Sequence, residues 1–136
     1  MYCDPESVTR VSSLGAGPIG GGWTAHFLAR GYDVTAYLHD ESETDAFMSI
    51  LNTAWVSLTA LGLSPGASMD RLRIVTDLEE ALDGAEFVQE SGPERLEIKQ
   101  ALYKKMGAIL PPSVVIGSST SGLMMSDIQV DCITPE

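Results

Sequence analysis

The sequence predicts an α/β fold: a doubly wound parallel sheet of about five strands with helices on both faces. Three observations predict it. Segments with strand character alternate strictly with segments of helical periodicity, a glycine-rich turn follows the first strand, and turn residues separate the elements. Such alternation implies parallel strands joined by right-handed crossovers. Ligands of these sheets bind at the carboxyl ends of the strands, where the strand order reverses.

A first strand over residues 10–14 runs directly into Gly15-Ala16-Gly17-Pro18-Ile19-Gly20 and then into a helix that ends near Gly31. The three spaced glycines fit the dinucleotide fingerprint of a Rossmann-type fold: the first allows a tight turn, the second a close approach of backbone to pyrophosphate, and the third close packing of helix on strand. The helix start adds unpaired N–H groups and a partial positive charge. We therefore expect this loop to bind a dinucleotide; an ordinary glycine-rich turn is the alternative.

The remaining elements follow in order. Strands are expected at 33–38, 71–76, 85–91 and 113–117, and helices at 43–61, 77–82, 94–110 and 125–130. Apolar residues three and four apart predict the buried faces of the two long helices. These are Phe47, Ile50, Leu51, Ala54, Trp55, Leu58 and Leu61 in one, and Leu96, Leu102, Met106, Ile109 and Leu110 in the other. The charged residues Glu94, Glu97, Lys99 and Lys104 are expected near the surface.

Composition limits the class of protein. The 136 residues, 44% of them apolar, suit one globular domain; we expect residues 8–136 to form it and 1–7 to be a disordered lead-in. No apolar run approaches a membrane span and no signal segment is visible, so a cytoplasmic protein without a membrane partner is expected. The net charge of −11 argues against nucleic acid. Cys3 and Cys132 are expected to be free thiols.

Several polar residues follow the predicted strands, and their loops should meet at one cleft. Glu90, Glu94 and Lys99 lie around the fourth strand's exit, although such charges are equally often solvated surface groups. Residues 118–121 are either part of the site or a hydroxyl-rich turn. His26 is expected to be structural, His39 lies on the adenosine side, and no metal site is expected. The first strand also carries Ser12 and Ser13, whose hydroxyls each cost about 1–3 kcal/mol if buried without a partner.

An acidic stretch follows the second strand. Leu38 stands where an acidic ribose ligand is expected, so Asp40, 20 residues after Gly20, is the candidate. Residues 31–70 contain no Lys or Arg, whereas a 2′-phosphate needs one nearby. NAD rather than NADP is therefore expected.

Four stretches together resemble the NAD-binding domain of the 3-hydroxyacyl-CoA dehydrogenase family, and most closely its L-carnitine dehydrogenase and lambda-crystallin-like branch. They are Leu14-Gly-Ala-Gly-Pro-Ile-Gly20 with Trp23, Ala25-His-Phe-Leu-Ala-Arg-Gly31, Phe87-Val-Gln-Glu-Ser-Gly-Pro-Glu-Arg-Leu-Glu-Ile-Lys99 and Ser118-Ser-Thr-Ser-Gly-Leu123. The resemblance implies an NAD-dependent oxidoreductase acting on a CH–OH group. In it, the 15–20 loop holds the pyrophosphate, Glu94 and Lys99 lie near the nicotinamide, and Ser121 hydrogen-bonds the substrate oxygen and borders the cofactor.

The resemblance also implies parts that lie beyond residue 136. The family's histidine base, a sixth strand and a helical C-terminal domain would follow there, so we expect no meaningful turnover from this chain and a homodimer only for a full-length enzyme. A non-catalytic dinucleotide-binding module is the alternative. CoA-using relatives place lysines on the helix after the second strand, whereas helix 43–61 has no basic residue. A small hydroxy acid such as L-carnitine is therefore favoured over an acyl-CoA.

Overall fold

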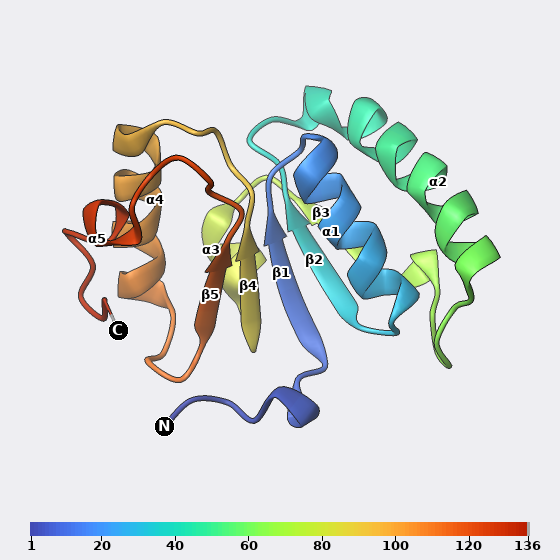
Figure 1. The fold of residues 1–136 in the computed structure, drawn as a ribbon, viewed down its shortest axis with the longest axis horizontal. Helices are drawn as coiled ribbons and strands as arrows, with labels where there is room; N and C mark the ends of the chain where they lie inside the picture. The colour runs from blue at the N-terminus through green and yellow to red at the C-terminus, as the bar shows by residue number, and fades with distance from the viewer. Residues whose placement is uncertain (136) are drawn as a thin grey trace.

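A five-stranded parallel sheet forms the centre of the protein, in a computed structural model that describes residues 1–135 (Figure 1). The strands are β1 (Arg10–Leu14), β2 (Asp33–Tyr37), β3 (Leu72–Val75), β4 (Phe87–Glu90) and β5 (Val115–Ser118). Their order is β3-β2-β1-β4-β5, so the chain moves outward from β1 to one edge and then returns to build the other half. This confirms the doubly wound Rossmann-type sheet and the reversal of strand order beside β1.

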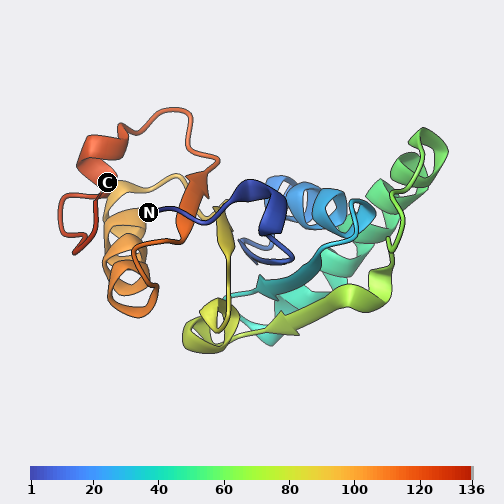
Figure 2. The same cartoon turned by 90° about the horizontal axis from the view of Figure 1, so that it is seen from below.

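Helices cover both faces of this sheet (Figures 1 and 2). Helices α1 (Pro18–Ala29) and α2 (Thr44–Leu61) pack together on one face, and α3 (Leu78–Leu82) and α4 (Leu96–Ile109) lie on the other. The short α5 (Met125–Ile128) packs against α4. Single 3-10 turns precede β1 (η1, Pro5–Ser7), α2 (η2, Glu41–Glu43) and β3 (η3, Met69–Arg71). Within residues 1–135, no helix has the length and apolar character needed to span a membrane.

The core has two parts, one on each face of the sheet. Beneath α1 and α2 it contains Ala25, Ala36, Leu38, Phe47 and Leu51. On the α3 and α4 face it is larger, and it comprises Leu14, Val75, Ala81, Leu82, Ala85, Val88, Tyr103, Met106, Leu110 and Ile128. Burial of these side chains on both faces is what a parallel sheet requires.

The stripe expected along α2 is the packed face of the helix, but it is fully buried only near its start. Phe47 and Leu51 are buried, Ala54 and Leu58 are half-buried against the same core cluster, and Leu61 at the helix end is exposed. Figure 1 shows α2 beside α1 at its start and diverging from it toward its end. Ile109, expected in the core, is also largely exposed because it ends α4.

The two serines of β1 are buried, but both hydroxyls have partners. Ser12 donates to the carbonyl of Ala81 on α3, and Ser13 accepts from Thr24 Oγ1 on α1 at 2.9 Å. The cost of an unpartnered hydroxyl therefore does not arise at either position. Each serine instead ties β1 to a helix, one on each face of the sheet.

Candidate functional site

The loops after β1, β2, β4 and β5 come together along the carboxyl edge of the sheet, at the top of the view in Figure 1. Backbone hydrogen bonds join each loop to a neighbouring strand. Gly15 N donates to Tyr37 O at 3.2 Å, Leu38 N to Val75 O at 3.0 Å, Ser91 N to Leu14 O at 2.7 Å, and Ser119 N to Glu90 O at 2.8 Å. Four separate parts of the chain thus lie along one edge of the sheet.

The loop between β1 and α1 is shaped by close backbone approaches. Gly15 has φ +133°, and a Cβ there would lie 2.5 Å from Ser91 O; a Cβ on Gly20 would lie 2.3 Å from Gly15 O. Only glycine fits either position. The space beside Gly17 is different, because a Cβ there would meet no atom within 4 Å.

This open space lies at the start of α1, where Gly17 is the N-cap and Pro18 occupies the first turn. The first N–H groups of a helix have no partners within it and carry partial positive charge, so they favour an anion. A loop closed tightly at Gly15 and Gly20 but open at Gly17 fits a pyrophosphate.

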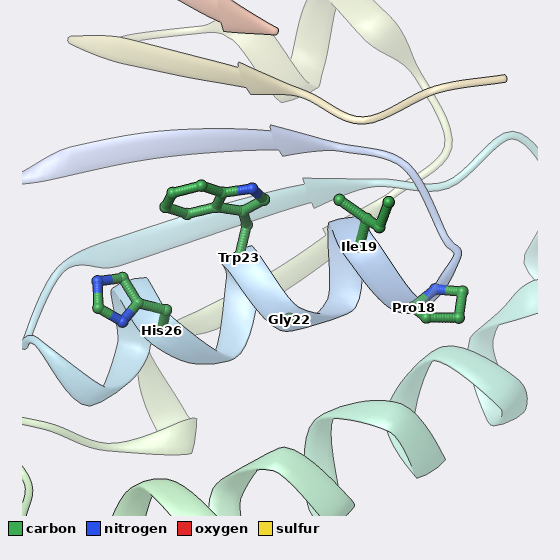
Figure 3. Close-up of a pocket in the computed structure, with 5 residues that line it drawn as sticks. All are labelled: Pro18, Ile19, Gly22, Trp23 and His26. Carbon is green, nitrogen blue, oxygen red and sulfur yellow. The ribbon is translucent and has the colours of Figure 1, made fainter. Parts of the chain in front are cut away.

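The outer side of α1 carries an apolar hollow rather than a core face. Figure 3 shows Ile19 and Trp23 standing out from the helix, with Pro18 at its start and His26 further along; Gly22 also lines the hollow. Ile19 is 60% and Trp23 40% exposed. These apolar side chains therefore lie on an exposed face of the helix. His26 is exposed on the same face, with its ring edge-on to Trp23 at a centroid distance of 5.9 Å.

The loop after β2 is acidic, as the sequence indicates. Leu38 is fully buried, whereas His39 and Asp40 are exposed at the edge of the cleft. The Asp40 carboxylate accepts from Ser42 N at 2.8 Å, and Glu43 Oε1 accepts from Asp40 N at 3.0 Å, which makes a capping box before α2. The hydrogen bond from Ser42 lowers the pKa of Asp40, so it is anionic at neutral pH. That Asp40 binds the adenosine ribose stays a prediction. In the structure it caps the turn before α2.

A buried ion pair lies under the loops after β4 and β5. Lys99 Nζ is 2.5 Å from Glu90 Oε1, and the two side chains are 1% and 0% exposed. Glu90 Oε1 also accepts from Gly92 N at 3.1 Å, and Glu90 Oε2 accepts from Ser118 Oγ at 2.5 Å. The carboxylate therefore contacts α4, its own loop and the end of β5 together.

Glu94 lies above this pair and holds the loop after β5. Its Oε1 accepts from Thr120 Oγ1 at 2.5 Å, from Ser121 N at 3.3 Å and from Gly122 N at 3.2 Å, while its Oε2 is 3.6 Å from Lys99 Nζ. The Thr120 hydroxyl and these N–H groups lower the pKa of Glu94. The structure thus brings together Glu94, Lys99 and Ser121, three of the residues that the sequence singled out.

The expectation that Lys99 lies near the surface is wrong, because its side chain is buried. Glu90 is buried too, so it is not a solvated surface group. The sequence did contain a signal for Lys99. The residues Leu96, Lys99, Tyr103, Met106 and Leu110 are spaced three and four apart, so they form one face of α4, and this face packs on the sheet. Reading lysine as a surface residue concealed its place in that stripe.

Tyr103 lies beside this network on the α4 side. Its hydroxyl is buried near Ser118 and Glu90 but has no hydrogen-bond partner among residues 1–135. Burial raises the pKa of Tyr103 to about 12, so the phenol stays neutral. Cys3 and Cys132 are free thiols, and the described part of the chain contains no cluster of three or more His, Cys, Asp or Glu side chains suited to a metal ion.

Comparisons with known proteins agree with this architecture. Residues 10–136 match the family described as 3-hydroxyacyl-CoA dehydrogenase, NAD binding domain. An L-carnitine dehydrogenase of Streptomyces coelicolor is 51% identical over 131 residues, which cover 96% of this chain and 41% of the relative. The chain thus spans about two fifths of the length of the curated relatives that it matches.

Two solved structures share the fold closely. A 5-formyl-3-hydroxy-2-methylpyridine 4-carboxylic acid 5-dehydrogenase superposes with a TM-score of 0.84 at 30% identity, over 95% of this chain and 42% of that one. The 3-hydroxybutyryl-CoA dehydrogenase of Escherichia coli K12 also superposes with a TM-score of 0.84, at 27% identity, over 96% of this chain and 28% of that one.

Proposed function

Because the chain belongs to the 3-hydroxyacyl-CoA dehydrogenase family, of which it is the NAD-binding domain, we propose that it serves the oxidation of a small hydroxy acid of the L-carnitine kind. The cofactor of the domain is NAD. The observation that carries the substrate proposal is the absence of Lys and Arg from residues 31–70, which include β2 and all of α2.

The open space at Gly17 and the start of α1 hold the pyrophosphate, flanked by Gly15, Ala16, Pro18, Ile19 and Gly20. Asp40 receives the adenosine ribose, and its charge disfavours a 2′-phosphate. NAD bound by these residues would supply the acceptor for the hydride that leaves the hydroxyl-bearing carbon of the substrate. Glu94, Lys99 and Ser121 act at that end of the site, where the Ser121 hydroxyl orients the substrate oxygen.

Removal of the substrate's hydroxyl proton needs a general base, and among the described residues no suitable base lies next to Ser121. Glu94 Oε1 is already occupied by Thr120 Oγ1 and by two backbone N–H groups, and its lowered pKa makes it a weak base. General-base catalysis contributes about 10²–10⁴-fold. We therefore expect the 136-residue chain to bind NAD without meaningful turnover, with residues 8–136 as the binding unit.

The acidic α2 side of the cleft supports a hydroxy acid over an acyl-CoA. CoA carries phosphates, each of which would gain about 1.5–3 kcal/mol from a well-formed charge-assisted hydrogen bond. Residues 31–70 offer no cation for such a bond and include six acidic side chains (Asp33, Asp40, Glu41, Glu43, Asp45 and Asp70). The trimethylammonium group of L-carnitine suffers no repulsion there.

Two experiments test the proposal. Calorimetric titration of the chain with NAD⁺ and NADP⁺ should show tighter binding of NAD⁺, and stronger binding of NADP⁺ would contradict the role given to the acidic loop. Turnover of L-carnitine and 3-hydroxybutyryl-CoA should then be compared in a full-length enzyme that carries this domain. A clear preference for the CoA ester would reject the substrate proposal without affecting the NAD assignment.

A further inference from the structure

We infer that the buried Glu90–Lys99 pair is a positioning device, which holds the loops after β4 and β5 in one fixed relation for the nicotinamide half of NAD. The inference rests on the proposed function and deepens it. It makes Glu90 a positioning residue that acts through Gly92, Ser118 and Lys99, since its side chain is 0% exposed and holds these three groups from beneath the loops.

In the proposed site, NAD lies along the carboxyl edge of the sheet in one direction. Gly15–Gly20 lie at the end of the central strand β1, and the acidic loop after β2 takes the adenosine ribose in this class of site. The nicotinamide half then extends the other way, over the loops after β4 and β5. Both loops are held from below by Glu90 and Lys99.

Glu90 and Lys99 join the loops after β4 and β5 through several contacts. Glu90 accepts from Gly92 N in the loop after β4 and from Ser118 Oγ at the end of β5; Ser118 Oγ in turn accepts from Thr120 N at 3.1 Å. Lys99 reaches Gly92 O at 3.4 Å and Glu94 Oε2 at 3.6 Å. The single ion pair therefore touches both loops and the carboxylate that binds Ser121 N.

The stability of the fold does not explain why these two charges are buried. A buried ion pair seldom adds stability over well-packed neutral side chains, because desolvation offsets the attraction; removal of one partner alone is strongly destabilising. Stability therefore gives little reason for two buried charges here. Their directed contacts do give one, because neutral side chains of similar size lack the three N–H donors and the two-oxygen acceptor that fix both loops.

The test separates positioning from stability. The double variant Glu90→Gln/Lys99→Met removes both charges and leaves no unpaired ion. Binding of NAD⁺ and of ADP-ribose, which lacks the nicotinamide, is measured by calorimetry, together with the melting temperature. We expect unchanged ADP-ribose affinity and about tenfold weaker NAD⁺ affinity, a difference of about 1.4 kcal/mol. The matched control is Arg73→Met/Glu80→Gln, which removes an exposed ion pair on β3 and α3, and it should change neither affinity.

Each result decides the question. Equal affinities in the double variant and the original chain, or equal losses for both ligands, would overturn the inference. Ser118→Ala is measured beside it, and it decides alone if the double variant does not fold. This change removes the bonds of the Ser118 hydroxyl to Glu90 Oε2 and from Thr120 N while Lys99 stays in place, and it should weaken NAD⁺ binding selectively. If Ser118→Ala leaves NAD⁺ binding unchanged, the inference is wrong. Failure of the original chain to bind either ligand would instead reject the proposed function.

Discussion

Gly17→Ala should separate cofactor binding from folding. Gly17 has an extended backbone (φ −81°, ψ −176°), which alanine adopts readily, and a Cβ there meets nothing within 4 Å. The cost to folding is that of a poorer N-cap, about 0.5 kcal/mol. The melting temperature should therefore fall by only about 1–2 °C.

NAD⁺ binding should respond much more strongly to the same change. The methyl group enters the space assigned to the pyrophosphate, and each charge-assisted hydrogen bond that it prevents is worth about 1.5–3 kcal/mol. Loss of one such bond weakens NAD⁺ binding about 10- to 150-fold. Calorimetric titration measures the affinity and differential scanning fluorimetry the melting temperature.

Two other glycines of α1 serve as controls. Gly20→Ala puts a Cβ 2.3 Å from Gly15 O, an overpacking cost of about 1–3 kcal/mol, so the melting temperature should fall by about 3–10 °C. Gly22→Ala meets nothing within 4 Å and should stabilise the helix by about 1 kcal/mol without altering NAD⁺ binding. Unchanged NAD⁺ affinity in Gly17→Ala would refute the assignment of the open space to phosphate.

Three further outcomes are expected. Asp40→Asn keeps an N-cap acceptor but removes a negative charge that would repel a 2′-phosphate 4 Å away by about 1 kcal/mol. The ratio of NADP⁺ to NAD⁺ dissociation constants, measured by calorimetry, should therefore fall roughly fivefold, and an unchanged ratio would show that Asp40 does not lie at the ribose. Tyr103→Phe removes a buried hydroxyl without a partner, so urea unfolding should give a free energy of unfolding about 1 kcal/mol higher, and a lower one would reveal a hidden partner. The backbone N–H groups of Thr9 and Arg10 depress the pKa of Glu86 from 4.5 to about 2. The contribution of the Glu86 carboxylate to stability is therefore present above its unfolded pKa of 4.5 and is lost as the pH falls from there through about 2. Glu86→Gln should lower the melting temperature more at pH 7 than at pH 2, and an equal deficit at both pH values would contradict this.

The sequence by itself determined the sheet, its five strands and the place of the glycine-rich loop after β1. Strand and helix patterns alternate, and each turn carries its own local chemistry: Pro18 in the first turn of α1, Asp77 as the N-cap of α3 and the glycines at 15, 17 and 20. These features act over a few residues, so they can be recognised without the fold. The acidic loop with Asp40 was equally visible, because charge is a property of composition.

Only the tertiary structure decided which polar side chains are buried and what they contact. Ser12 meets a carbonyl 69 positions away, and Glu90 meets Ser118 from another strand. Periodicity places Lys99 on a helix face, but whether that face meets solvent or a carboxylate depends on what lies opposite. The reverse holds for Trp23, a large apolar side chain on α1 that no element covers within the described chain. Burial is a property of two packed surfaces, and a single segment specifies only one of them.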